Sequence, residues 1–334
     1  MTPRTPRRWY RRGHRGGLLD LAARPASALW SLATARRIAR GAAVDPGVPV
    51  VCVGNLTVGG SGKTPVVREL SRSLIASGLA AHILTRGHGG RLRGPLQVDP
   101  ASHSAGEVGD EALMLAGDAP VWVARLRAEG AKAAAAAGAA VIVMDDGHQN
   151  PDVLKRLSLI VVDGETRDGE WPFGDGRVFP AGPLREPFAT GLARADAVVL
   201  LLAPDAGAPD PELLRLFQEK SVLVARLTAA APPPGPQLGF AGIGKPWRME
   251  RALRTAGCDL VAFAPLADHQ VLGESLLQGL AARAARLGAG LITSEKDWAR
   301  LPPTWRDRVT FWPVRAQFED PAALERLLQP VLAT

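Results

Sequence analysis

The sequence predicts an α/β fold: a parallel β-sheet with helices on both faces, followed by a second, smaller α/β lobe. Short apolar runs, many of them β-branched, alternate with segments of helical character along most of the 334 residues. Continuous apolar runs of this kind are typical of strands buried on both faces of a parallel sheet. A glycine-rich loop follows the first run, and a proline-rich stretch at residues 229–236 precedes a second set of runs. The chain is therefore expected to form a core that carries a phosphate-type loop, joined to a separate lobe.

Strands and helices are predicted to alternate in both lobes. In the larger lobe, strands are expected at residues 50–53, 81–85, 97–98, 120–124, 140–144, 157–162 and 197–202, with helices at 65–77, 108–116 and 127–137. In the smaller lobe, strands are expected at residues 238–241, 259–264, 290–293 and 309–312, with helices at 247–256, 274–286 and 321–332. The predicted division is a basic arm at residues 1–40, a core lobe at 41–205, a connecting segment at 206–236 and a smaller lobe at 237–334.

The segment from residue 50 to residue 64 has the order strand, glycine-rich loop and helix start. This order makes a phosphate cradle, because backbone N–H groups and the positive end of the helix dipole face the loop. Lys63 is expected to reach the β- and γ-phosphates of a nucleotide, and the Thr64 hydroxyl to hold Mg²⁺. The residues expected to contact the nucleotide are Thr57, Gly59, Gly60, Ser61, Gly62, Lys63 and Thr64. The segment predicts a P-loop NTPase-like core.

The loop departs from the pattern G-x-x-x-x-G-K-[ST] at one place, since the residue six before Lys63 is Thr57 rather than glycine. The alternative is an ordinary glycine-rich turn after a strand. The order of strand, Gly-Gly-Ser-Gly-Lys-Thr and helix favours nucleotide binding over that alternative.

Acidic residues stand at two further places where chemistry is expected. Asp145 and Asp146 end a hydrophobic strand, where a carboxylate commonly partners the Mg²⁺ of a phosphate loop; the alternative is a turn with solvated acids. Asp110 begins a helix, and the alternative to a chemical role is that this carboxylate only caps the helix. His269 follows a predicted strand of the smaller lobe, and spacing alone does not tie it to Asp110.

The positive charge of the chain is concentrated in its N-terminal arm. The net charge is +7, and residues 1–40 contain ten arginines against Asp20 alone, so the rest of the chain carries −2. Such an arm suits an anionic surface, either a membrane or a nucleic acid. A helix at residues 26–40 is expected to place Leu29, Trp30, Ala33 and Ile38 in a headgroup layer, with Arg36, Arg37 and Arg40 facing phosphates. The alternative is a helix packed on the domain with a solvated basic face.

No segment of the sequence is apolar over the roughly 20 residues needed to span a bilayer. The Arg11-Arg12 pair is not expected to start an export signal, because Asp20 and Arg24 interrupt what would be its apolar region. The two cysteines, Cys52 and Cys258, suggest a reduced compartment without a disulfide framework.

An ordered set of motifs resembles the tetraacyldisaccharide 4′-kinase family, the lipid A 4′-kinases of Gram-negative bacteria. The matching stretches are VGNLTVGGSGKTP (53–65), LTRGHGG (84–90), VGDEALML (108–115), DDGHQ (145–149), GRVFPAGPLREP (176–187), RADAVVL (194–200), FAGIGKP (240–246), DHQ (268–270) and TSEKDWARL (293–301). Thr57 in place of the usual glycine also fits this family. The set is far more specific than the phosphate loop alone.

The resemblance implies ATP- and Mg²⁺-dependent phosphorylation of the 4′-hydroxyl of an acylated glucosamine disaccharide 1-phosphate, giving the lipid A precursor lipid IVA. It also implies two lobes with the active site between them. The N-terminal arm would bind an anionic membrane surface, at the cytoplasmic face of the bacterial inner membrane. No nucleic-acid partner is expected, and no obligate protein partner is evident.

The resemblance also assigns roles to individual residues. Asp110 matches the catalytic aspartate and His269 the histidine that pairs with it. The residues implied near the metal are Thr64, Asp145, Asp146 and Glu186, and those implied near substrate or phosphate are Asn55, Arg86, Gln149 and Arg185. The chain departs from the common family pattern at His148, Asn150 and Gln270.

Two other classes of function are open from the residues alone. Residues 293–297 weakly resemble the Asn-Lys-x-Asp motif of guanine-nucleotide switches, but the asparagine is absent. A metal-delivery ATPase would need a cysteine–histidine site, which the sequence lacks. A nucleic-acid-binding ATPase has only the basic arm in its favour.

Overall fold

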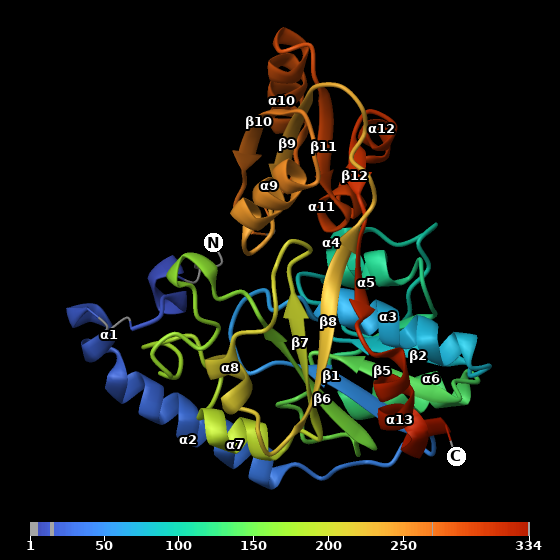
Figure 1. Cartoon of the computed structure of the whole chain (residues 1–334). Helices are drawn as coiled ribbons and strands as arrows, with labels where there is room; N and C mark the ends of the chain where they lie inside the picture. Colours follow the sequence, from blue (N-terminus) through green and yellow to red (C-terminus); the bar gives the residue numbers. More distant parts are fainter. Residues whose placement is uncertain (1–5, 14–16, 269, 333–334) are drawn as a thin grey trace.

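Two β-sheets organise the computed structural model, which describes residues 6–13, 17–268 and 270–332 (Figure 1). Within these residues the larger sheet has nine strands in the order β13-β8-β7-β6-β1-β5-β2-β4-β3. Their bounds are β1 Val50–Gly54, β2 Ala81–Thr85, β3 Leu96–Gln97, β4 Val121–Val123, β5 Val141–Asp145, β6 Leu157–Asp163, β7 Ala197–Leu202, β8 Ser221–Ala229 and β13 Val314–Phe318. The pairs from β8 through β4 are parallel, and the two edge strands β3 and β13 pair antiparallel.

Helices cover both faces of the larger sheet, as the continuous apolar runs predict. Alternate residues of β1 point to opposite faces: Val51 and Val53 pack in the same cluster as α3 (Lys63–Ala76) and α13 (Pro321–Leu332), whereas Val50 and Cys52 pack with α6 (Arg127–Ala136). The other helices of this lobe are α4 Ala105–Val108, α5 Asp110–Leu115, α7 Phe188–Ala193 and α8 Pro211–Arg215. The predicted P-loop NTPase-like architecture is confirmed.

The smaller lobe is built on a parallel sheet of four strands in the order β10-β9-β11-β12. Its elements are β9 Gln237–Ala241, α9 Pro246–Thr255, β10 Leu260–Pro265, α10 Glu274–Arg286, β11 Gly290–Ser294, α11 Glu295–Ala299, α12 Pro303–Arg306 and β12 Thr310–Trp312. The buried ring of Trp305 and side chains from α10 and β9 form its main core.

The sheets divide the chain differently from the sequence prediction in two places. Strand β8 lies in the predicted connecting segment, yet it pairs with β7 in the larger sheet. Strand β13 and helix α13 lie in the predicted smaller lobe, yet β13 pairs with β8 and α13 packs on the core of the larger lobe. The chain therefore crosses between the lobes twice, through the neighbouring strands β8 and β13 (Figure 1).

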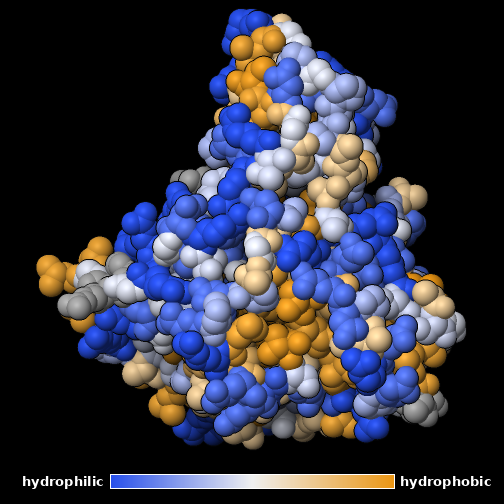
Figure 2. Space-filling view, in the orientation of Figure 1, coloured by the Kyte–Doolittle hydropathy of each residue, from blue (hydrophilic) through white to orange (hydrophobic). Residues whose placement is uncertain are grey.

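The N-terminal arm forms η1 (Arg7–Tyr10), α1 (Leu18–Ala22) and α2 (Arg24–Arg40), so the helix expected at residues 26–40 is present. Only Ser27 and Thr34 of α2 are buried, and Trp30 packs edge-on against Phe179. Large apolar side chains stay exposed: Leu18 (87%), Leu19 (77%), Leu29 (68%) and Leu32 (62%). Figure 2 shows apolar surface at the left, where Figure 1 places α1. None of the described helices meets the length and apolarity of a membrane span.

Candidate active site

The glycine-rich loop joins the end of β1 to the start of α3, at the carboxyl edge of the larger sheet, where ligands of such sheets bind. Gly62 has φ +78°, and a Cβ on it would lie 2.3 Å from Leu201 Cδ2, so only glycine fits there. Behind the loop, Val58 N–H donates to the Pro183 carbonyl oxygen at 2.8 Å. Two buried polar atoms of this region, Asn55 Oδ1 and Ser61 Oγ, have no hydrogen-bond partner among the described residues. Buried polar atoms normally have one, so these atoms suit a bound polar ligand.

Thr57, which stands where the usual pattern has glycine, is buried and has structural partners. It forms an isolated antiparallel bridge with Leu184. Its carbonyl oxygen accepts hydrogen bonds from Asn55 Nδ2 at 2.8 Å and from Arg185 Nε at 2.9 Å. Thr57 therefore ties the loop to the segment that carries Arg185.

Lys63 and Arg185 converge on one oxygen of Asp146. Lys63 Nζ lies 3.3 Å and Arg185 Nη1 lies 2.7 Å from Asp146 Oδ1. Burial alone would raise the pKa of Asp146, but the two cations hold that pKa far below its ordinary value. Two cations beside a phosphate loop can also bind a phosphate group.

The neighbouring carboxylate, Asp145, lies in a different environment. It is buried, its Oδ2 accepts a hydrogen bond from Thr85 Oγ1 at 3.3 Å, and its Oδ1 has no partner among the described residues. Burial, with repulsion from Glu111 and Asp146, raises the pKa of Asp145 to about 7. The positive φ of Asp146 (+51°) turns the two consecutive side chains to different surroundings. Asp145 thus has a buried oxygen that can bind a cation, whereas Asp146 forms ion pairs with Lys63 and Arg185.

Glu186, implied as a metal neighbour, has both carboxylate oxygens engaged. Arg194 Nη2 donates to them at 2.6 and 2.7 Å, and Gln149 Nε2 donates to Oε1 at 2.9 Å. Gln149 Nε2 also donates to the Asn55 carbonyl oxygen at 2.9 Å. Glu186 thus holds Gln149 against the loop, and both of its oxygens already accept hydrogen bonds. The sequence analysis gave no role to Arg194, because nothing near it in sequence signals a pairing with Glu186.

His148 lies behind the site. Its Nδ1 is 3.2 Å from Ser158 Oγ and its Nε2 is 2.8 Å from the Gly191 carbonyl oxygen. Burial lowers the pKa of His148 to about 4. This departure from the family pattern therefore concerns packing behind the loop that follows Asp145.

The contact between Gly54 and His148 gives a stability prediction. A Cβ on Gly54 would lie 2.4 Å from His148 Cβ and 2.9 Å from its backbone nitrogen. Gly54→Ala is therefore expected to lower the free energy of unfolding by about 1–3 kcal/mol, measured by urea denaturation. Gly279→Ala is the control, because a Cβ there meets nothing within 4 Å. Equal stability of Gly54→Ala and the wild type would contradict this packing.

Asp110 lies where the two lobes meet. It is buried at the start of α5, and its Oδ1 accepts a hydrogen bond from the Glu111 backbone N–H at 2.9 Å. Its Oδ2 is 3.7 Å from Arg300 Nε and 4.0 Å from Lys296 Nζ, both on the small-lobe segment that begins at α11. His269 lies outside the described residues. Its neighbour Asp268 places Oδ1 4.0 Å from the same Lys296 Nζ, so Asp268 and Asp110 share a cationic partner.

The smaller lobe also reaches the phosphate loop itself. A Cβ built on Gly244 would lie 3.5 Å from Gly60 N and 3.6 Å from Asp268 Oδ2. The loop after β9 therefore contacts both the phosphate loop and Asp268 at Gly244. Arg86, by contrast, is exposed in the loop after β2.

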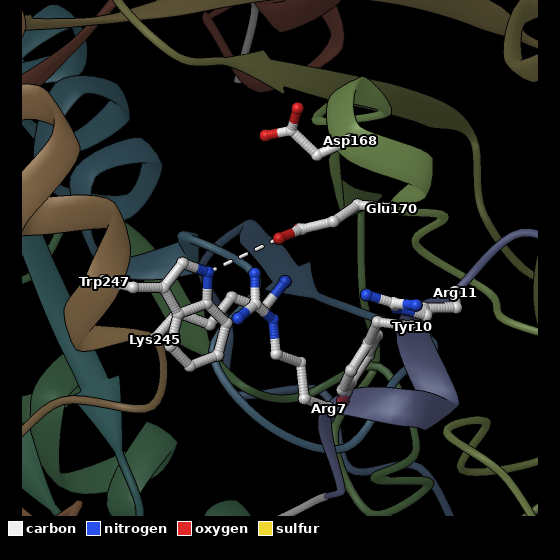
Figure 3. A pocket seen from close by; sticks show the side chains of 7 residues that line it. All are labelled: Arg7, Tyr10, Arg11, Asp168, Glu170, Lys245 and Trp247. Atoms are coloured by element: carbon white, nitrogen blue, oxygen red, sulfur yellow. Dashed lines mark hydrogen bonds between the residues drawn. The ribbon is translucent and has the colours of Figure 1, made fainter.

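A small pocket beside the phosphate loop shows how the arm and the smaller lobe meet there (Figure 3). Tyr10 donates its hydroxyl to the Val58 carbonyl oxygen, and Lys245 Nζ lies 4.7 Å from the Tyr10 ring centroid. Lys245 Nζ also lies 2.7 Å from Asp163 Oδ2 at the end of β6. The pocket is lined by Arg7, Tyr10, Arg11, Asp168, Glu170, Lys245 and Trp247. Lys245 pairs with Asp163, Glu170 with Arg248 and Asp168 with Arg251, each across the two lobes. The pocket therefore belongs to the contact between the lobes.

Comparison with known proteins gives a consistent result. The model of the family described as tetraacyldisaccharide-1-P 4′-kinase matches residues 19–333. A tetraacyldisaccharide 4′-kinase of Phenylobacterium zucineum is 63% identical over 97% of this chain and 98% of its own, and one of Caulobacter vibrioides is 61% identical over 98% of each. The crystal structure of LpxK from Aquifex aeolicus in complex with ATP superposes with a TM-score of 0.74 at 23% identity, covering 94% of this chain and 100% of that one.

Proposed function

The chain belongs to the tetraacyldisaccharide 4′-kinase family, and we propose that its site transfers the γ-phosphate of ATP to the 4′-hydroxyl of an acylated glucosamine disaccharide 1-phosphate. The product is the 4′-phosphorylated precursor of lipid A. The observation that carries the residue assignment is the meeting of three groups between the lobes. These are the phosphate loop with Lys63, the acidic end of β5, which Lys63 contacts at Asp146, and Asp110, which is linked to the loop through Lys296, Asp268 and Gly244.

The large lobe would bind the triphosphate. The loop supplies backbone N–H groups, and Lys63 and Arg185 already share an anionic partner in Asp146. ATP phosphates would compete for these two cations. Phosphoryl transfer depends mostly on positioning and on neutralising the charge of the transferred group, and these cations would do both.

The oxygen donors fit Mg²⁺, which takes oxygen ligands in an octahedron and usually keeps phosphates and waters in its shell. No group of three metal-ligating side chains occurs in the part of the chain that the structure describes. That suits an ion held jointly by protein and nucleotide. Asp145 Oδ1 and the Thr64 hydroxyl would hold it, with Glu186 acting behind them through Gln149. When bound, Mg²⁺ would neutralise charge on the β- and γ-phosphates.

Asp110 would be the general base for the sugar hydroxyl. A hydroxyl is a poor nucleophile at neutral pH, and a positioned carboxylate can accept its proton as the new bond to phosphorus forms. His269 would assist Asp110 from the opposite lobe. With partners in both lobes, the base would be complete only when the lobes meet, which would limit transfer of the phosphate to water.

The arm would hold the enzyme at the cytoplasmic face of the inner membrane, where the acyl chains of the substrate lie. The exposed leucines of α1 and α2 stand beside Arg24, Arg36, Arg37 and Arg40, which suits an interfacial helix on anionic lipid. Trp30 Nε1 donates to the Arg185 carbonyl oxygen at 3.0 Å, so α2 also contacts the segment that carries Arg185.

Replacing Leu29 and Leu32 with serine is expected to weaken binding to vesicles of anionic phospholipid by about tenfold or more, because buried leucines contribute about 1.5–3 kcal/mol each. Co-sedimentation with vesicles measures the effect. Leu287→Ser, a change of the same type at an exposed leucine of the smaller lobe, is the control. Unchanged vesicle binding would contradict the anchor. After removal of residues 1–40, retained vesicle binding with lost nucleic-acid binding would favour the nucleic-acid alternative.

The proposed reaction is tested by supplying ATP with and without the acylated disaccharide 1-phosphate. A kinase of this kind consumes ATP in step with formation of a bisphosphorylated lipid. A nucleotide switch would hydrolyse ATP or GTP at the same rate without the lipid. Rates that do not depend on the lipid would overturn the proposal.

A further inference from the structure

Lys296 carries an ammonium group that three carboxylates share. Its Nζ lies 3.0 Å from Glu111 Oε1, 4.0 Å from Asp110 Oδ2 and 4.0 Å from Asp268 Oδ1. Two of these acids belong to the large lobe and one to the small lobe, and Lys296 is itself a small-lobe residue with a 17% exposed side chain. Its helix, α11, packs against α5 (Figure 1). Lys296 therefore lies at the point where the lobes close over Asp110.

The local sequence fixes the position of Lys296. The Ser294 hydroxyl caps α11 by accepting from the Asp297 N–H at 3.1 Å, and Asp297 Oδ2 accepts from the Gly242 N–H at 3.0 Å. Arg300 donates to the Gly242 carbonyl oxygen at 3.2 Å and to the Gln270 carbonyl oxygen at 3.0 Å. These hydrogen bonds join helix α11 to the loops that carry Gly244 and Asp268. Lys296 is therefore expected to move together with these loops.

The charges require a cation at this point. Asp110, Glu111 and Asp268 are close enough to one ammonium that they would repel one another without it. Arg300 gives Asp110 a second cation at 3.7 Å, and the nearby Glu295 is paired with Arg68 of α3 at 2.5 Å. Burial alone would lower the pKa of Lys296, but Glu111, Asp110 and Asp268 raise that pKa above its ordinary value, so the lysine stays charged.

We propose that Lys296 is a positioning residue for phosphoryl transfer: it bridges Asp110 and Asp268 across the lobes and holds the base in place when they close. The inference rests on the assignment of Asp110 as the base. Because Lys296 approaches Asp110 from the opposite lobe, an open enzyme would lack this contact. Lys296 would therefore act on the rate of transfer and leave ATP binding unchanged, since ATP is assigned to the large lobe.

Lys296→Met is expected to lower kcat by about 10- to 100-fold, because small displacements of a reacting group can cost about 10² in rate. The dissociation constant for ATP, measured by calorimetry, should stay within about threefold. Lys296→Arg, which keeps the charge, should recover at least part of the lost kcat. If Lys296→Met does not fold, Lys296→Gln removes the charge with a smaller change in polarity. An unchanged kcat, or a higher KM for the lipid with unchanged kcat, would overturn the proposal.

Arg251→Met is the matched control, because Arg251 also bridges the lobes, through Glu165 at 2.5 Å and Asp168 at 3.4 Å, but does not contact Asp110. If Lys296 only held the lobes together, both variants would lose similar activity, which would contradict a role at the base.

A double-mutant cycle separates this inference from the proposed function. In an Asp110→Asn background, Lys296→Met should lower kcat by less than about threefold, because residues that act through one another are not additive. Fully additive losses would overturn the inference alone. Wild-type activity of Asp110→Asn would instead overturn the assignment of the base.

Discussion

Lys63→Ala is expected to lower transfer of the γ-phosphate by about 10²- to 10³-fold, the usual cost of removing one preorganised group that stabilises a transition state. Lys63 begins α3 directly after Gly62, and its ammonium already lies 3.3 Å from Asp146. During transfer, the γ-phosphate would replace Asp146 as the ion-pair partner of the Lys63 ammonium. The rate of labelled phosphate transfer from ATP to the lipid acceptor measures the loss.

The fold should survive this substitution, because Asp146 keeps its 2.7 Å contact with Arg185. Thermal unfolding near that of the wild type would show this. Lys132→Ala is the matched control: Lys132 is exposed on α6 and pairs only with Glu129 among the described side chains, at 3.4 Å. A Lys63→Ala enzyme with a rate within threefold of the wild type would contradict the role of the loop.

Asp110→Asn is expected to lower kcat by ~10²–10⁴, the usual contribution of a general base. The amide has nearly the shape of the carboxylate and can still accept from the Glu111 N–H, so the start of α5 should be preserved. The amide cannot take the proton of the 4′-hydroxyl. Because the phosphates of ATP are assigned to the glycine-rich loop, Lys63 and Arg185 rather than to Asp110, the dissociation constant for ATP should change by less than about threefold.

Stopped-flow or quenched single-turnover transfer isolates this effect from product release. Asp168→Asn makes the same chemical change at a side chain that is 78% exposed and serves as control. Equal losses of ATP affinity and turnover in Asp110→Asn would show that Asp110 supports nucleotide binding, contrary to its assignment as base.

The fold was predictable wherever its signal is local. Strands β1, β5 and β7 are continuous apolar runs, and their burial on both faces follows from composition. Strand β8 is mostly half-buried and ends beside a proline-rich stretch, so its sequence resembles a linker. The return of β13 to the larger sheet depends on pairing with β8, a contact that no nearby residue signals.

The candidate site was likewise predictable where its signal is local and not where it depends on distant contacts. Lys63, Thr64 and Asp145 could be proposed from motifs whose spacing carries the chemistry, and Asp110 from the family resemblance. The different surroundings of Asp145 and Asp146 could not, because they depend on a positive φ at Asp146 and on distant partners. The pairing of Glu186 with Arg194 and the bridge made by Lys296 join segments that only the folded chain brings together.

The position of the transferred phosphate tests the account most directly. Wild-type enzyme, ATP, Mg²⁺ and the acylated disaccharide 1-phosphate should give one product with a second phosphate monoester on the 4′-oxygen, seen by phosphorus NMR and mass spectrometry. Its rate of formation should equal the rate of ATP consumption, and both should be nearly lost in Lys63→Ala and Asp110→Asn. ATP consumption that continues without the lipid, or a phosphate on any other oxygen, would contradict the account.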